Sequence, residues 1–526
     1  MSDLQGLPEV FEAVRALREQ VLLVAAELER KWQPAIERED FRDPARNLAC
    51  YLALRGHDLR ELQLALTRFG LSSLGRSESR VKSTLDALTA NLAILSGQRE
   101  RVPGPYPDED EVWRGARAIE ATALQLFGES QGERQTRILV TLPSEARGNV
   151  EFMRNLLLGG AECVRINCAH DDAEAWLEML NALRRAELEL ESTQRTRVLM
   201  DLGGPKVRTL RPRKQEGEPL HVGDKLWLTR AEPGALKAHK KHPLPVVGCT
   251  LPQALDRLAV GHRVFIDDGQ LGAHVVETGV DGAVLEVFQA PDHGRKVRSD
   301  KGINFPDTEF EVSPLTDKDR ADLEFVARHA DMVGYSFVQQ EADIDALLEE
   351  LVQRETDEHR AALVLKIETK LAVRNLPGLL IRSAGKRPTA VMIARGDLAV
   401  ELGFRRMAEM QEEILWLCEA AHVPVIWATQ VLETLAKEGL PTRAEVTDAA
   451  MASRAECVML NKGPHVVDAI RLLADVLSRM QGHQYKKSAR LRILHSWESL
   501  TQGSERQESA PTSRAAPTLP GTPATH

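Results

Sequence analysis

The sequence predicts an α/β protein, a (β/α)8 TIM barrel with an inserted small β-barrel domain and an N-terminal all-helical region. From Thr136 onward, eight short apolar runs alternate with amphipathic segments of helical length. Strands that alternate with helices form parallel sheets through right-handed crossovers, and eight of them favour a closed barrel over an open sheet. One interval breaks the alternation with short segments and turn signals, which indicates an inserted β domain.

Size, charge and cysteine usage exclude several classes of protein. The 526 residues exceed one ordinary domain, and 68 Lys and Arg against 78 Asp and Glu give a net charge of −10. This balance provides no broad basic surface for nucleic acid or an anionic membrane. The six cysteines lack paired spacing, no run approaches the roughly 20 apolar residues that span a bilayer, and no signal pattern opens the chain. We expect a cytoplasmic protein that binds neither nucleic acid nor membrane.

The helical region is predicted over residues 1–131. Apolar residues recur at helical spacing over 10–30, 44–69 and 77–95. These residues carry no catalytic signature, and we hypothesise that their apolar faces supply contacts between subunits of a homo-oligomer.

The barrel is predicted over 132–209 and 302–482. Its strands are expected at 138–142, 163–166, 198–200, 332–335, 363–367, 391–394, 423–428 and 457–460. Amphipathic helices are expected between most of them, for example over 149–158, 172–190, 318–329 and 405–421, with a last helix over 466–480.

Residues 210–301 are predicted to form the inserted β domain. The segments 226–228, 263–266 and 283–287 alternate in polarity, and Asp268-Gly269 and Asp281-Gly282 are hairpin signals. Such an insertion lies at the barrel rim and can act as a lid. The tail, 483–526, has little to bury and is expected to be largely disordered.

Three predicted strands end in polar residues spaced two apart. Side chains alternate faces along a strand, so the members of each pair are expected to point the same way. Solvated strand ends are the alternative for any one pair, but three together favour an active site at the C-terminal rim of a barrel. The pairs are Lys366 and Glu368, Arg395 and Asp397, and Arg165 and Asn167.

Seven motifs between about 136 and 480 resemble the pyruvate kinase family, in its order and at its spacing. One such motif is weak evidence, whereas seven in register are strong. They are Thr136-Arg-Ile-Leu-Val-Thr-Leu, Val164-Arg-Ile-Asn-Cys-Ala-His170, Met200-Asp-Leu-Gly-Gly-Pro-Lys-Val-Arg-Thr209, Phe265-Ile-Asp-Asp-Gly269, Lys366-Ile-Glu368, Ala394-Arg-Gly-Asp-Leu398, and Ala428-Thr-Gln-Val-Leu-Glu433 followed by Pro441-Thr-Arg-Ala-Glu445.

The resemblance implies transfer of a phosphoryl group from phosphoenolpyruvate to ADP, giving pyruvate and ATP in glycolysis. Glu368 and Asp397 match the family's ligands for Mg²⁺, which Mn²⁺ can replace. Lys366 matches the lysine that neutralises the transferring phosphoryl group, and Arg165 matches the arginine that holds the phosphate.

The resemblance also assigns the rest of the site. The backbone of Gly396 and Asp397 suits the substrate carboxylate, and Thr429 lies beside it and on the route by which the enolate is protonated. Asn167, His170 and Arg208 match the nucleotide side.

The monovalent-cation site of the family is degenerate in this sequence. Asn167, Asp201 and the carbonyl of Leu202 remain, but Ala169 replaces a serine and Lys206 replaces a glutamate. In family members that need no potassium this position is lysine, whose ammonium can stand where the cation would. We therefore predict activity that does not require K⁺.

Other departures affect the nucleotide side and regulation. Gly203 replaces a lysine, and the loop after the eighth strand is shortened to residues 461–464. The family's C-terminal regulatory domain has no counterpart in this sequence. Two alternatives therefore stay open: an enzyme that handles phosphoenolpyruvate or an enolpyruvate with a different acceptor, and a non-catalytic phosphoenolpyruvate sensor. The sensor is the alternative that the intact residues Lys366, Glu368, Asp397, Arg165 and Thr429 speak against.

Overall fold

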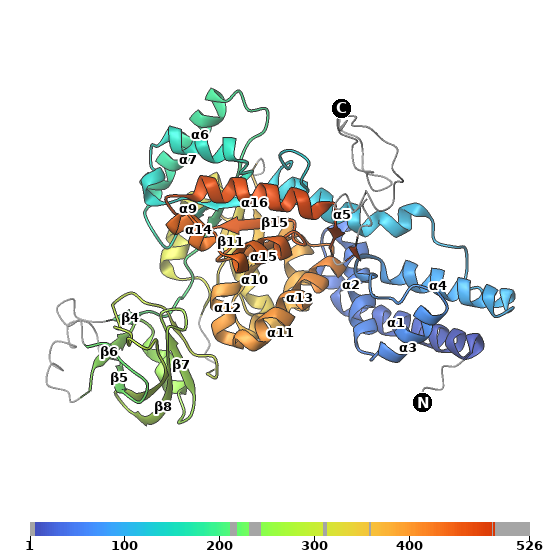
Figure 1. Ribbon diagram of the computed structural model, residues 1–526, viewed down its shortest axis with the longest axis horizontal. Coiled ribbons are helices and arrows are strands. Elements are labelled where there is room, and N and C mark those ends of the chain that lie inside the picture. The colour runs from blue at the N-terminus through green and yellow to red at the C-terminus, as the bar shows by residue number, and fades with distance from the viewer. Residues whose placement is uncertain are drawn as a thin grey trace, which may run out of the picture.

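Eight parallel strands close into a barrel at the centre of the molecule (Figure 1). The computed structural model describes residues 6–210, 218–230, 244–308, 313–356, 359–486 and 488–489. Around the barrel the order is β1-β15-β14-β13-β12-β11-β3-β2, which confirms the predicted fold class. The strands are β1 (Arg137–Thr141), β2 (Cys163–Asn167), β3 (Arg197–Asp201), β11 (Met332–Tyr335), β12 (Ala362–Ile367), β13 (Thr389–Ala394), β14 (Val425–Ala428) and β15 (Cys457–Leu460).

Helices follow every barrel strand and cover the outside of the barrel. Many begin at a side chain that caps the free amides of the first turn: Asn149 accepts from the amide of Phe152, and Thr369 from that of Ala372. The helices are α6 (Val150–Gly159), α7 (Ala173–Glu189), α9 (Asp317–His329), α10 (Glu341–Val352), α11 (Lys370–Ala384), α12 (Arg395–Leu402), α13 (Phe404–Ala420), α14 (Glu433–Glu438), α15 (Arg443–Ala452) and α16 (Val466–Gln481).

The inserted domain, called the lid below, leaves the barrel after β3 and returns before α9. Its sheet has the order β10-β7-β8-β9-β5-β6-β4. Backbone bonds from Thr209 to Lys301 and from Ile303 to Val207 join its two edges, so the sheet closes on itself. The lid has its own hydrophobic core, separate from that of the barrel. Its strands are β4 (Thr209–Leu210), β5 (Lys225–Thr229), β6 (Val246–Cys249), β7 (Arg263–Ile266), β8 (Leu271–Gly279), β9 (Gly282–Gln289) and β10 (Ile303–Asn304).

The helical region lies at the opposite end of the molecule from the lid (Figure 1). The stretch 44–69, which the sequence pattern presents as one helical run, is two helices, because the chain turns at Gly56. The helices are α1 (Leu7–Trp32), α2 (Arg42–Arg55), α3 (Arg60–Arg68), α4 (Val81–Leu95) and α5 (Glu109–Phe127).

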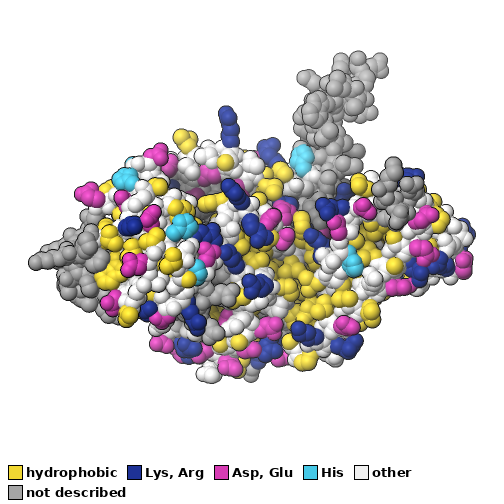
Figure 2. All heavy atoms as spheres, turned by 90° about the horizontal axis from the view of Figure 1, so that it is seen from below, with side chains coloured by type: hydrophobic (Ala, Val, Ile, Leu, Met, Phe, Trp, Pro, Cys, Tyr) yellow, Lys and Arg dark blue, Asp and Glu magenta, His cyan; other side chains and the backbone are white. Residues whose placement is uncertain are grey.

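The helical region and the barrel share one continuous hydrophobic core. Asn47 on α2 donates to the carbonyl of Ala420 at 2.8 Å, and the guanidinium of Arg55 lies 5.1 Å over the ring of Trp416 on α13. The end of α5 closes the N-terminal mouth of the barrel, where Phe127 joins a cluster with the inward side chains of the strands. Much of the apolar surface from which we argued for subunit contacts is therefore buried within this chain. Hydrophobic side chains still gather on the face seen from below, where the barrel meets the helical region (Figure 2).

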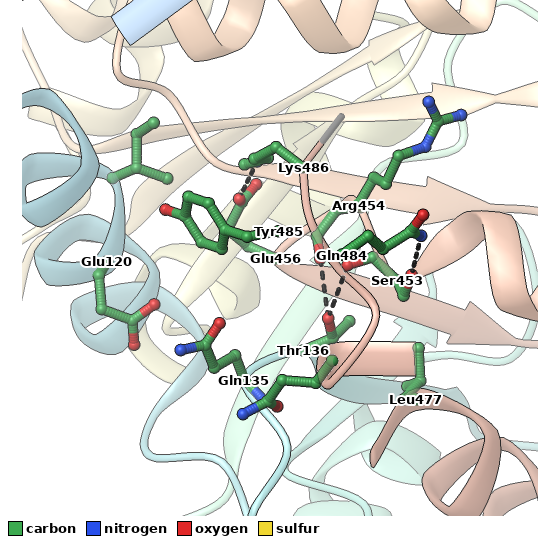
Figure 3. Close-up of a pocket in the computed structure, with 13 residues that line it drawn as sticks. Glu120, Gln135, Thr136, Ser453, Arg454, Glu456, Leu477, Gln484, Tyr485 and Lys486 are labelled. Carbon is green, nitrogen blue, oxygen red and sulfur yellow. Dashed lines mark hydrogen bonds and ion pairs between the residues drawn. The ribbon is translucent and has the colours of Figure 1, made fainter. Parts of the chain in front are cut away.

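A short hairpin at the N-terminal end of the barrel belongs to the predicted tail. Strands β16 (Gln484–Tyr485) and β17 (Ser488–Ala489) pair after α16. Gln484 donates to Ser453 at 2.8 Å, and Lys486 points at the buried carboxylate of Glu456 (Figure 3). The described start of the predicted tail, 484–486 and 488–489, is thus an ordered hairpin held by this buried ion pair and by side-chain bonds. The rest of the tail, 490–526, lies outside the described residues.

Candidate active site

A cavity of about 160 Å³ opens at the C-terminal rim of the barrel, beside the two segments that lead to the lid. Side chains that follow β2, β3, β11, β12, β13 and β14 meet there because parallel strands end at one rim. Its lining includes Arg165, Asn167, Leu202, Gly203, Lys206, Arg208, Ser336, Lys366, Glu368, Gly396, Asp397 and Thr429.

Lys366 lies at the centre of the charges in this cavity. Its ammonium is 3.0 Å from Glu368, 3.3 Å from Asp201 and 2.6 Å from the hydroxyl of Ser336. Burial alone would lower the pKa of Lys366, but the carboxylates of Asp201 and Glu368 outweigh it, so the pKa is raised. The lysine is therefore a fixed positive charge.

Arg165 is held by the same aspartate. Its Nε donates to Asp201 at 2.8 Å, and Nη1 donates to Thr141 at 3.3 Å. Asp201 is 0% exposed; burial raises its pKa, but Lys366 and Arg165 lower it by more, so it is ionised. One buried carboxylate thus orients both cations toward the cavity.

Glu368 and Asp397 are neighbouring carboxylates on this lining. Glu368 is 3% exposed and accepts a bond from the amide of Phe337 at 2.6 Å. Its pKa is raised, first by burial and further by the charge of Asp397, although Lys366 opposes both. Two acidic groups on one cavity wall fit a divalent cation, whose preferred ligands are such oxygens. In the described part of the chain no group of three or more acidic, histidine or cysteine side chains is placed to hold a metal, so a cation here needs further oxygens from substrate and water.

Gly396 and Asp397 lie in the first turn of α12, as the sequence predicts. Ala394 ends β13, and the helix begins at the next residue. A Cβ on Gly396 would stand 3.3 Å from the hydroxyl of Thr429, so only a residue without a side chain leaves this backbone open beside the threonine. Free amides at a helix start suit a carboxylate.

The prediction that Arg395 and Asp397 point the same way is wrong. Arg395 opens α12 instead of continuing β13, so the two side chains follow helical and not strand spacing. Arg395 bonds Asp448 at 2.8 Å and stacks 4.8 Å over Trp427, and it does not line the cavity. The pairs Lys366 with Glu368 and Arg165 with Asn167 do share the cavity.

The predicted nucleotide residues lie toward one side of the rim. Asn167 and Arg208 line the cavity, whereas His170 is not part of its lining. The pKa of His170 is lowered by partial burial and then by the positive charges of Lys462 and Arg208. Sequence reasoning missed Lys462, although it lies in the shortened loop 461–464.

Ser336 is a second residue that sequence reasoning missed. Its hydroxyl accepts from Lys366 at 2.6 Å and donates to the carbonyl of Leu202 at 2.7 Å. The signal was available, since Ser336 is the first polar residue after the buried strand β11.

Among the described residues, Lys206 makes no hydrogen bond or ion pair with the residues of the degenerate cation site. Asp201 is engaged by Arg165 and Lys366, and Asn167 accepts from the amide of Ala169 at 3.1 Å. The ammonium of Lys206 instead lies 2.9 Å from Asp397. In this structure Lys206 therefore pairs with the predicted divalent-cation ligand.

A second, smaller cavity lies at the N-terminal end of the barrel, between α5, α16 and the hairpin (Figure 3). Its volume of about 40 Å³ holds little more than a water molecule. Glu120, Thr136 and Glu456 on its wall already bond to other protein groups. This cavity is a packing gap between α5, α16 and the hairpin, and it is too small for a substrate.

Fold and rim together define a (β/α)8-barrel protein with a lid inserted after the third strand. The family model for the barrel domain of pyruvate kinase matches residues 133–464. The chain belongs to the pyruvate kinase family.

Individual relatives agree with this assignment. Over 66% of this chain, the sequence is 30% identical to pyruvate kinase 2 of Synechocystis. Over 65% of this chain, it is 30% identical to the pyruvate kinase of Kluyveromyces lactis. It is 32% identical to the pyruvate kinase of Encephalitozoon cuniculi over 62%. The matches span 57%, 66% and 70% of those relatives. Of the helices in the described ranges, none combines the length and apolar character needed to cross a membrane.

Proposed function

We propose that the chain transfers a phosphoryl group from phosphoenolpyruvate to ADP, giving pyruvate and ATP. The observation that carries the proposal is the placement of Lys366 between Glu368 and Asp201, at 3.0 and 3.3 Å, in a cavity that Arg165 and Asp397 also line. A protein that only binds phosphoenolpyruvate has no evident need for this lysine.

The two cations act on the phosphate. Phosphoryl transfer has a loose transition state whose charge is spread over the equatorial oxygens, so fixed positive groups stabilise it. Arg165, oriented by Asp201, binds the phosphate of phosphoenolpyruvate, and Lys366 neutralises the group as it moves. The bond from phosphorus to the enol oxygen breaks, and a bond to a β-phosphate oxygen of ADP forms.

A magnesium or manganese ion is held by Glu368 and Asp397 in this proposal. When bound, the ion neutralises phosphate charge and orients the substrate oxygens. The amides of Gly396 and Asp397 bind the substrate carboxylate, and Thr429 lies on the route by which the enolate gains its proton at C3. Asn167, His170 and Arg208 bind the nucleotide, and Lys462 adds positive charge beside His170.

An assay of the purified chain with phosphoenolpyruvate, ADP and Mg²⁺, coupled to pyruvate reduction, tests this function. Lys366→Met is expected to lower kcat by about two orders of magnitude or more, because the fixed charge is lost. Lys386→Met is the control, since this lysine pairs with Asp345 on the outer helices and lines no part of the cavity. Full activity in Lys366→Met, or none in the unaltered chain, contradicts the proposal.

We also propose that activity does not need potassium. Lys206 adds a positive charge to the lining of the cavity that Asn167 and Leu202 of the monovalent-cation site also line, although its ammonium pairs with Asp397 in this structure. Rates measured in K⁺ and in Na⁺ at equal ionic strength are expected to agree, and a strong stimulation by K⁺ would refute the proposal.

A different phosphoryl acceptor is the second candidate, favoured by Gly203 and the shortened loop 461–464 on the nucleotide side. The same assay separates the candidates. Pyruvate formation that depends on Mg²⁺ but not on ADP would favour the second one, and phosphoenolpyruvate binding without turnover would indicate a sensor.

We propose, finally, a cytoplasmic homo-oligomer. All six cysteines are free and buried, as suits a reducing compartment. Exposed Phe404 on α13 and Leu64 on α3 are large hydrophobic side chains suited to contact a second copy. Light scattering of the full chain is expected to give a multiple of its 58.4 kDa mass, and Phe404→Glu is expected to reduce it.

A further inference from the structure

Lys206 connects three parts of the molecule at the edge of the cavity. It lies in the segment between β3 and β4, the first of the two hinge segments that lead to the lid. Its ammonium is 2.9 Å from Asp397 on the barrel rim and 3.8 Å from Asp268 in the lid turn between β7 and β8.

The second hinge segment also contacts this side chain. A Cβ built on Gly302 would stand 2.9 Å from the Cε of Lys206, so the alkyl stem lies directly on the returning strand. The preceding residue, Lys301, pairs with Asp267 of the lid at 3.0 Å. Among the described residues, Lys206 contacts a carboxylate of the barrel rim, whereas Lys301 contacts a carboxylate of the lid.

Opposite charges on Lys206, Asp397 and Asp268 stabilise this contact. The ammonium of Lys206 lies within 4 Å of two carboxylates, those of Asp397 and Asp268. A divalent cation on the same oxygen of Asp397 would repel the ammonium, because like charges a few ångströms apart in a partly desolvated site interact strongly. The cation and the ammonium therefore compete for Asp397.

We propose that Lys206 is a latch that couples cation binding to the lid. In the cation-free protein its ammonium holds Asp397 and ties the lid to the barrel rim, and a divalent cation at Asp397 displaces it and frees the hinge. The inference rests on the proposed function in one respect only, the binding of the cation by Glu368 and Asp397. Lys206 is in this account a positioning residue.

Binding of Mn²⁺ to the full chain without substrates tests the competition. Titration followed by electron paramagnetic resonance is expected to show at least tenfold tighter binding to Lys206→Met than to the unaltered chain. Lys206→Arg keeps the charge and is expected to stay within threefold of the unaltered chain. Lys301→Met, the matched control on the other hinge segment, is expected to do the same. Equal effects of Lys206→Met and Lys301→Met would mean a general charge effect and would overturn the latch.

A distance measurement between the lid and the barrel tests whether cation binding is coupled to the position of the lid. Val280 at a lid turn and Val352 at the end of α10 are both strongly exposed, and the six native cysteines are buried. Spin labels on Val280→Cys and Val352→Cys therefore report the distance between lid and barrel, with diamagnetic Mg²⁺ as the cation. The cation-free chain is expected to give a narrow distribution that changes with Mg²⁺.

In the labelled chain, Lys206→Met is expected to give the Mg²⁺-type distribution without any cation. Asp268→Asn, which removes only the lid side of the contact, is expected to broaden the cation-free distribution while Mn²⁺ affinity stays within threefold. A cation-free distribution unchanged by Lys206→Met overturns the proposal.

Failure of the latch and failure of the proposed function are distinguishable, because neither experiment contains phosphoenolpyruvate or ADP. An inactive chain that shows the coupling would refute the kinase proposal alone. An active chain whose lid distances ignore Lys206 would refute the latch alone.

Discussion

Asp201 is the common partner of the two cations at the rim, Arg165 and Lys366. It is completely buried, yet two cations hold its pKa below the usual value, so it stays ionised. Removing a carboxylate of this kind would leave Arg165 and Lys366 without their common partner, and a buried unpaired charge is costly. The cations at the rim are therefore positioned before substrate arrives, which is the arrangement that lowers reorganisation during the reaction.

Ser336 is expected to position Lys366. In Ser336→Ala the ammonium loses its 2.6 Å contact, and a hydrogen bond to a charged group is worth about 1.5–3 kcal/mol, so kcat should fall roughly 10-fold or more. Steady-state kinetics would show this in kcat more than in KM. Ser383→Ala is the control, since this buried serine bonds to Thr389 at 2.7 Å, away from the cavity. Equal losses in both variants would indicate only general destabilisation.

His422 makes stability depend on pH. It lies where α5 and the turn before α4 meet the barrel, and its Nε2 is 3.0 Å from the carbonyl of Ser79. Burial lowers its pKa from 6.5 to about 4, although the bond to Ser79 opposes this. Between these values the unfolded chain binds more protons, so this contribution is complete above pH 6.5 and is lost as the pH falls toward 4.

The expected loss in the free energy of unfolding between pH 7 and pH 5 is about 2 kcal/mol from this residue. Urea unfolding at the two pH values measures it. His422→Gln should show a smaller difference than the unaltered chain, whereas His293→Gln, at an exposed position of the lid, should not change it. A difference unaffected by His422→Gln would remove the histidine from the explanation.

At the scale of elements, the break between β13 and α12 sets which backbone groups face the cavity beside Thr429. The apolar run ends at Ala394, and the polar residues after it begin a helix at once. The first-turn amides of that helix therefore open onto the rim beside Thr429, while Arg395 turns outward to Asp448. A strand in this place would have presented Arg395 and Asp397 together and would have left no free amides.

Helix α5 closes the N-terminal end of the barrel through Phe127, which is 1% exposed. Phe127→Ala should lower the free energy of unfolding by about 3–5 kcal/mol, because a buried aromatic ring leaves a cavity. Denaturant unfolding measures this. Leu124→Ala lies on the same helix at 43% exposure and should cost less than about 1 kcal/mol. Similar losses in the free energy of unfolding for both variants would show that Phe127 does not stabilise the barrel by closing its N-terminal end.

For the whole molecule, the hydrophobic cores decide which parts unfold together. The helical region and the barrel belong to one hydrophobic cluster, whereas the lid has its own. Elements that share a core open together, and an element with a separate core and a narrow hinge can open alone.

Native-state hydrogen exchange should therefore divide the described chain into two units. Amides of α2 and α4 are expected to exchange with the same free energy as those of the barrel strands, and amides of β8 and β9 with a lower one. The dependence of exchange on denaturant measures both values. Exchange of α4 at the lower value, with the barrel still protected, would contradict a shared core.

The sequence by itself determined the barrel, the insertion point of the lid and which residues meet at one rim. Apolar runs report buried strands directly, and parallel strands bring their ends to one rim, so Arg165, Lys366, Glu368 and Asp397 could be placed together without coordinates. Only the tertiary structure decided what meets across elements: Ser336 under Lys366, α5 in the mouth of the barrel, and Lys206 on Asp397. Periodicity records which face a residue takes on its own element, whereas these contacts depend on how separate elements pack, and no local pattern encodes that.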